Sequence, residues 1–197
     1  MNTQHSMQAL QITEANGSFN FTEQPIPQAG PGQVLVKVAA SGINPLDLKI
    51  RAGQAAHAKQ PFPAVLGIDM AGEVVATGPD ITHFAVADKV YGMSGGVAGQ
   101  QGSLAQYQLV DADLLAKAPS NISLRQAAAM PLVVITAWEG LIDRARVAAG
   151  HKVLVQGGAG GVGHVAVQLA KAFGAEVYAT ASAKDADYIR SLGAVFY

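Results

Sequence analysis

The sequence has 197 residues, of which 50% are hydrophobic and 14% are charged, with a formal net charge of −1. This length and composition allow one or two domains with a substantial core, and the small net charge provides no electrostatic footprint for nucleic acid. The absence of cysteine excludes disulfides, thiol catalysis and any thiolate zinc site. No secretory signal begins the chain, and the longest apolar stretch, residues 127–138, contains Pro131 and is too short to cross a bilayer. We therefore expect a cytoplasmic protein without a membrane partner.

The chain up to about residue 120 predicts a β-rich domain. Residues 8–13 and 18–23 alternate apolar and polar side chains on either side of Asn16-Gly17, which is typical of a β-hairpin. Further strands are expected at residues 33–40, 71–77, 89–91 and 105–109. The glycines and prolines between these segments favour a small, partly open barrel.

Helical segments follow the β-rich part. Residues 121–130 begin with Asn121 and Ser123, either of which is a suitable helix cap, and predict a first helical region. After Pro131, residues 133–146 predict a second helix.

Residues 152–182 predict a βαβ unit. A β-branched strand at 152–155 passes directly into a Gly-x-Gly-x-x-Gly motif at 158–163. An amphipathic helix then opens at about Val162 and closes at Gly174, and a second strand covers 176–182. A glycine motif in this strand–turn–helix context indicates a dinucleotide-binding site.

Each glycine of the motif has a physical role in this interpretation. Gly158 permits the tight turn, Gly160 lets the backbone approach a pyrophosphate, and Gly163 allows the helix to pack closely on the strand. The helix N-terminus then offers unpaired N–H groups to the phosphates. The alternative is a glycine-rich turn that binds nothing. The residues expected to contact the cofactor in this turn are Gly158, Ala159, Gly160, Gly161, Val162 and Gly163.

The end of the second strand favours NADPH over NADH. An NAD site usually has Asp or Glu there to hold the ribose 2′-hydroxyl, but no carboxylate follows Thr180 before Asp185. Ser182 and Lys184 would instead hold a 2′-phosphate. The alternative is that Ser182 caps the next helix and Lys184 is merely solvated, and the two interpretations are compatible.

The last residues predict a helix at 185–192 and the start of a third strand at 194–197. Two parallel strands and a short third one are fewer than a dinucleotide-binding sheet normally has. We therefore expect a fragment, a truncated product, or half of a protein that needs a partner.

Five segments in this order resemble the medium-chain dehydrogenase/reductase superfamily, and within it the zinc-independent quinone oxidoreductase branch. They are residues 40–47, 65–74, 88–92, 135–141 and 157–163. The resemblance implies an α/β chain with a β-rich N-terminal domain. A GroES-like catalytic domain would cover residues 1–122, and the first part of a Rossmann NADPH-binding domain would cover 123–197. The family's active site lies between these domains. The resemblance implies a homodimer for a full-length parent, but not for this chain.

The resemblance also predicts that the chain holds no metal. Zinc enzymes of the superfamily carry their cysteine and histidine ligands where this sequence has Asn44, Ile68 and Leu132. None of these three side chains is a normal zinc ligand, and the neighbouring carboxylate, Asp69, cannot make a site alone.

Asn44 and Thr136 match family residues near the nicotinamide. We expect Asn44 to be catalytic, because its amide would orient the cofactor carboxamide or donate to the oxyanion that forms on the substrate. We expect Thr136 to contact the cofactor. The alternatives are that Asn44 caps the turn at 45–48 and that the Thr136 hydroxyl bonds within its own helix.

The predicted function is NADPH-dependent hydride transfer to a small molecule, either a quinone or an α,β-unsaturated carbonyl, without zinc. Such acceptors are already electrophilic, so the protein need only place them and hydrogen-bond the developing oxyanion. Two alternatives stay open. One is reduction of an enoyl thioester, and the other is a nucleotide-binding or scaffold module without turnover.

Overall fold

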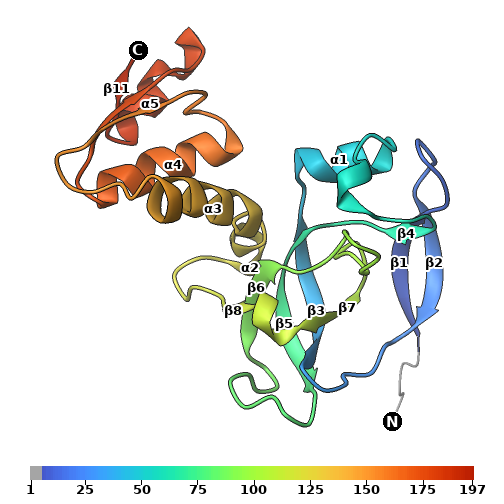
Figure 1. Ribbon diagram of the computed structural model, residues 1–197. Coiled ribbons are helices and arrows are strands. Elements are labelled where there is room, and N and C mark those ends of the chain that lie inside the picture. The colour runs from blue at the N-terminus through green and yellow to red at the C-terminus, as the bar shows by residue number, and fades with distance from the viewer. Residues whose placement is uncertain (1–5) are drawn as a thin grey trace. The chain divides into compact units, whose positions relative to one another are not determined.

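The computed structural model describes residues 6–197 (Figure 1). Contacts divide the chain into two compact units, Met1–Leu132 and Val133–Tyr197. Residues 123–132 therefore have their contacts in the first unit, and a domain boundary at residue 122 stays a prediction. Among the described residues, no helix is both long and apolar enough to cross a membrane.

The first unit contains two antiparallel sheets. The three-stranded sheet has the order β2-β1-β4, and the five-stranded sheet has the order β7-β3-β5-β6-β8. The strands are β1 (Ser6–Ile12), β2 (Asn20–Pro25), β3 (Gln33–Gly42), β4 (Ala64–Val65), β5 (Asp69–Thr77), β6 (Lys89–Met93), β7 (Tyr107–Asp111) and β8 (Ala116–Lys117). The hairpin expected around Asn16 is confirmed, since β1 pairs with β2 from Ser6↔Pro25 to Gln11↔Asn20.

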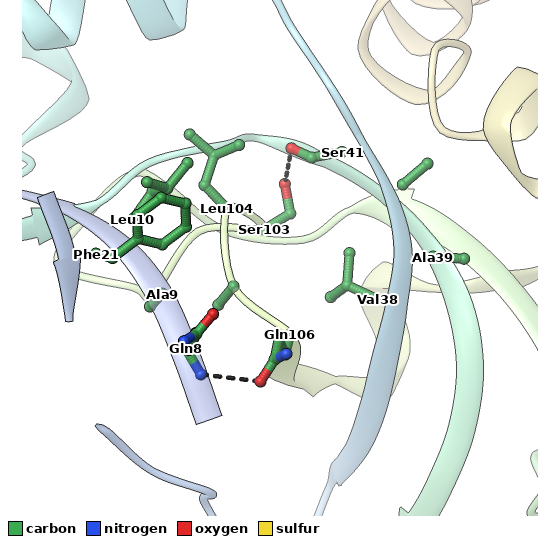
Figure 2. Close-up of a pocket in the computed structure, with 12 residues that line it drawn as sticks. Gln8, Ala9, Leu10, Phe21, Val38, Ala39, Ser41, Ser103, Leu104 and Gln106 are labelled. Atoms are coloured by element: carbon green, nitrogen blue, oxygen red, sulfur yellow. Dashed lines mark hydrogen bonds between the residues drawn. The ribbon is translucent and has the colours of Figure 1, made fainter. Parts of the chain in front are cut away.

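Residues 104–106 form a short segment that joins the two sheets into a partly open barrel. The Leu10 N–H donates to the Leu104 carbonyl at 2.8 Å, and the Gln106 N–H donates to the Gln8 carbonyl at 3.0 Å. On the other side, the Val38 N–H donates to the Gln106 carbonyl at 2.9 Å. Figure 2 shows this segment between β1 and β3, beside an open groove of about 330 Å³. The strand expected at 105–109 is thus divided between this connection and β7.

The barrel core follows from alternation along the strands. Val34 and Val36 of β3 are fully buried, as are Met70 and Val74 of β5. These side chains lie on one face because successive residues of a strand point to opposite faces. A second cluster contains Ile50 and packs under the short helices α1 (Pro45–Arg51) and η1 (Ala56–Ala58). Helix α2 (Leu124–Ala127), capped by Ser123 as expected, contacts β3 and β5.

The second unit is a parallel sheet with helices packed against it. The strand order is β11-β10-β9, with both pairs parallel. Its elements, with α3 beginning at the unit boundary, are α3 (Pro131–Trp138), the π-helical segment η3 (Glu139–Arg144), β9 (Lys152–Val155), α4 (Gly161–Ala172), β10 (Glu176–Ala179), η4 (Ala183–Asp185), α5 (Ala186–Ser191) and β11 (Val195–Phe196). Val167, Val177 and Ile189 are buried at its core.

The βαβ prediction is confirmed, with two differences at element ends. Helix α4 begins at Gly161, one residue before Val162, a shift that is common because helix ends fray. The second strand ends at Ala179 rather than at residue 182, because beyond it Thr180 bonds into the glycine turn. Before this unit, the helix expected at 133–146 is α3 followed by a π-helical segment.

Candidate active site

The glycine turn is fixed by hydrogen bonds to the next strand. The Gly158 N–H donates to the Thr180 carbonyl at 2.8 Å, and the Gly157 N–H donates to the Thr180 hydroxyl at 3.2 Å. The Gly160 N–H donates to the Gly157 carbonyl at 2.9 Å and closes the turn. The turn therefore sits at the carboxyl end of the sheet, the edge where ligands bind in open α/β folds.

Steric limits explain why this turn needs glycine. A Cβ on Gly163 would lie 2.1 Å from the Gly157 carbonyl oxygen, and one on Gly158 would lie 2.8 Å from the Ala179 Cβ. Gly163 and Gly158 thus let the helix and the turn approach β9 and β10. The left-handed residue of the turn is Gly157, with φ of 68°, which sequence reasoning did not single out. Two adjacent glycines, 157 and 158, were the available signal.

The exposed part of the turn leads into the N-terminus of α4. Gly160 and Gly161 are exposed, and Ala159 and Val162 are half-buried. Gly160 is the N-cap residue with an extended backbone, and a Cβ there would find its nearest neighbour at 3.2 Å. The first N–H groups of a helix lack carbonyl partners inside it, and the positive end of the helix dipole lies there. This arrangement suits an anionic oxygen.

Ser182 and Lys184 lie at the same sheet edge. Because β9 and β10 are parallel, the residues that follow β10 emerge beside the glycine turn. Ser182 and Lys184 are both exposed, and Ser182 precedes η4 without forming a side-chain cap hydrogen bond. The capping alternative for Ser182 is therefore not formed in the structure. Thr136 lies in α3 and is exposed.

Asn44 lies in the first unit, at the N-cap of α1. The helix starts there because Pro45 occupies its first turn and Asp47 places a carboxylate near its N-terminus. The Asn44 N–H donates to the Asp47 carboxylate at 2.8 Å, as in a capping box. The Asn44 side chain has a second partner, because its Nδ2 donates to Asp69 Oδ2 at 3.0 Å. The capping and functional interpretations of Asn44 are therefore compatible.

Two buried carboxyl groups flank Asn44. Asp69 is 1% exposed and accepts the Leu132 N–H at 3.1 Å and 3.2 Å on its two oxygens. Burial raises the pKa of Asp69 to about 6, opposed by the hydrogen bonds from Asn44 and Leu132 and reinforced by the charge of Asp47. Burial also raises the pKa of Asp47, which is opposed by N–H groups including that of Asn44.

A small apolar cavity of about 110 Å³ lies beside α1. Ile43 and Leu48 contribute to it from either side of Asn44 in the sequence, and Phe19, Leu66 and Leu104 supply further apolar surface. Asp47 and Arg51 also border the cavity, but its surface is mainly apolar, so it suits a hydrocarbon group. Among residues 6–197, no three His, Cys, Asp or Glu side chains lie close enough together to hold a metal ion.

Known proteins share this combination of units. Residues 30–120 match the family described as the alcohol dehydrogenase GroES-like domain. The crystal structure of an alcohol dehydrogenase superfamily protein from Novosphingobium aromaticivorans is 57% identical, with a TM-score of 0.95, over 97% of this chain and 58% of that one. The chain belongs to the medium-chain dehydrogenase/reductase superfamily.

Other members of the superfamily are also similar. An Arabidopsis thaliana protein named NADPH-dependent alkenal/one oxidoreductase, chloroplastic, is 44% identical over 175 residues, which are 86% of this chain and 45% of that protein. The structure of the quinone oxidoreductase from Coxiella burnetii is 34% identical with a TM-score of 0.85, covering 97% of this chain and 61% of that one. The chain spans about half the length of the curated relatives it matches.

Proposed function

We propose that this chain belongs to an NADPH-dependent oxidoreductase that transfers hydride to a quinone or an α,β-unsaturated carbonyl without zinc. The observation that carries the proposal is the glycine turn at the open N-terminus of α4. Gly158 and Gly163 have no room for a side chain, whereas Gly160 is exposed. A pyrophosphate needs a stretch of exposed backbone that it can approach closely, and tightly packed glycines on either side provide one.

The residues after β10 support NADPH as the cofactor. Ser182 and Lys184 are exposed beside the turn, and no carboxylate lies between Thr180 and Lys184 to hold a ribose 2′-hydroxyl or to repel a 2′-phosphate. A hydroxyl and an ammonium group provide charge-assisted hydrogen bonds to phosphate. The Arabidopsis relative that is named as NADPH-dependent is consistent with this assignment.

The surroundings of Asn44 support chemistry without zinc. At the three ligand positions of the zinc enzymes, the side chain of Asn44 is bound to Asp69, Ile68 is buried and apolar, and Leu132 has an apolar side chain and donates its backbone N–H to Asp69. A bound reduced nicotinamide would supply the hydride. Asn44 would then donate an N–H to the substrate oxygen as negative charge develops on it.

The apolar cavity supports a substrate with a hydrocarbon part. Its lining includes Ile43 and Leu48, which stand on either side of Asn44 in the sequence, and offers a hydrocarbon surface to a ligand. We propose that an alkyl or ring substituent of the quinone or enone occupies it, and that Thr136 contacts the cofactor. We also propose that the oxidoreductase is cytoplasmic and acts as a homodimer.

A fluorescence titration tests the cofactor assignment directly. The purified chain is titrated with NADPH and with NADH, and the Gly160→Asp variant is titrated with the same two cofactors. The aspartate Cβ would lie 3.2 Å from the Gly157 carbonyl oxygen, a tight contact that a small shift of the turn relieves, and its carboxylate would stand where the pyrophosphate would lie. We expect saturable, NADPH-preferring binding that Gly160→Asp abolishes while the circular dichroism spectrum is unchanged. Unaltered affinity in the variant would reject the assignment of this turn as the phosphate-binding site. If the unmodified chain binds NADPH, a screen of quinones and enones as substrates follows.

A further inference from the structure

The carboxamide of Asn44 is held by a buried carboxylate from a different element. Asn44 is 5% exposed and Asp69, the first residue of β5, is 1% exposed. The Asn44 Nδ2 donates to Asp69 Oδ2 at 3.0 Å. An ionised carboxylate can only accept hydrogen bonds, whereas an amide has a donor end and an acceptor end. Ionised Asp69 therefore determines which end of the Asn44 amide is the nitrogen.

Asp69 is itself fixed in place. The Leu132 N–H donates to both of its carboxylate oxygens, and the Ser103 hydroxyl donates to its backbone carbonyl at 2.8 Å. Together with the Asn44 amide, three separate parts of the chain thus restrain this residue. Its carboxylate cannot turn away from Asn44 without losing the Leu132 hydrogen bond inside a buried site.

Asn44 is restrained from its other side by α1. The Asp47 carboxylate accepts the Asn44 N–H at 2.8 Å, so the backbone and the side chain of Asn44 are each held by a carboxyl group. The amide nitrogen carries two N–H groups, and the hydrogen bonds of the described chain use the one that points to Asp69.

We propose that Asp69 is a positioning residue, which locks the Asn44 carboxamide so that its second N–H is presented to the oxygen of a bound quinone or enone. This proposal rests on the proposed function for the identity of the ligand. The locking itself is a property of the free chain. The lock predicts that the side-chain amide of Asn44 is held in one orientation while Asp69 is ionised, and that it becomes free to turn when Asp69 loses its charge.

The lock depends on pH because a protonated carboxyl group donates rather than accepts. Burial raises the pKa of Asp69 to about 6. The groups that face it are the Asn44 amide and the Asp47 carboxyl from α1 and the Leu132 N–H. Below this pH the Asn44 amide can turn its oxygen toward a neutral Asp69, and the orderly presentation of the second N–H is lost.

Nuclear magnetic resonance on the unmodified chain tests the lock without cofactor or turnover. The side-chain amide signals of Asn44, assigned by their loss in Asn44→Ala, are followed with pH together with the Asp69 carboxyl carbon. We expect both to titrate together near pH 6, and we expect the Asn44 titration to vanish in Asp69→Asn and to persist in the exposed control Asp143→Asn. If the Asn44 amide signals of the unmodified chain do not change while the Asp69 carboxyl group titrates, the proposal is overturned. This outcome can be read even if Asp69→Asn fails to fold.

A double-mutant cycle tests what the lock does for a ligand. Reduction of 2-cyclohexen-1-one by NADPH is measured for Asn44→Ala, Asp69→Asn and the double variant. If Asp69 acts through Asn44, the double variant loses no more activity than Asn44→Ala, and Asp69→Asn loses the acidic limb of the pH profile. If the activity loss of the double variant is instead the product of the losses of the two single variants, the positioning role is overturned. Absence of turnover in the unmodified chain would reject the proposed function for this chain, while the magnetic resonance result would still decide the lock.

Discussion

Replacement of Asp69 by Asn should change how the stability of the first unit depends on pH. In the folded chain burial raises the pKa of Asp69 from 3.8 to about 6. Between these values folding binds a proton, so the contribution of Asp69 to the free energy of unfolding is fully present in acid and is lost as the pH rises through about 6. Asparagine has nearly the same shape and does not titrate.

The size of the effect follows from the two pKa values. Each pKa unit corresponds to about 1.4 kcal/mol. The rise from 3.8 to about 6 therefore means that full ionisation of Asp69 lowers the free energy of unfolding by about 3 kcal/mol. About half of it, roughly 1.4 kcal/mol, falls between about pH 5 and about pH 8. The free energy of unfolding of Asp69→Asn, relative to that of the unmodified chain, should therefore rise by roughly 1.4 kcal/mol over this range.

Urea denaturation followed by circular dichroism is the suitable assay. The single tryptophan, Trp138, lies in the second unit and would not report on β5. Asp143→Asn, at an exposed position, corrects for the loss of one carboxylate from the net charge. A difference in unfolding free energy that stays constant from about pH 5 to about pH 8 would refute the reasoning, because it would mean that Asp69 ionises as readily in the folded chain as in the unfolded one.

Three further predictions concern the turn, the cofactor and the cavity. Gly163→Ala should lower the free energy of unfolding by about 1–3 kcal/mol, because its Cβ would lie 2.1 Å from the Gly157 carbonyl oxygen; a melting temperature equal to that of the unmodified chain would contradict this. Lys184→Ala should weaken NADPH binding about tenfold or more and leave NADH nearly unaffected, and equal losses in paired fluorescence titrations would remove the 2′-phosphate argument. Leu48→Trp should fill the apolar cavity and raise KM for bulky enones more than for acrolein; an equal change for both would exclude the cavity as a substrate pocket.

The elements of this fold that the sequence predicts well are those with a local physical cause. The glycine motif, the alternation in β3 and the capped start of α2 each depend on residues a few positions apart. Their existence could be predicted, although α4 begins one residue earlier than expected. The end of β10 could not, because Thr180 is drawn into hydrogen bonds with the turn more than 20 residues earlier in the chain.

The surroundings of Asn44 show where sequence reasoning stops. Asn44 and Asp47 are three residues apart, so a helix cap could be expected from their spacing. Asp69 and Leu132 are distant in sequence from Asn44 and from each other, and only the tertiary fold brings them together, through the hydrogen bonds of Asp69 with the Asn44 amide and the Leu132 N–H. A carboxylate between two apolar residues at the start of a strand, as in Ile68-Asp69-Met70, was the available signal. Burial of such a group is costly unless hydrogen bonds compensate it, so an acid at that position points to partners elsewhere in the chain.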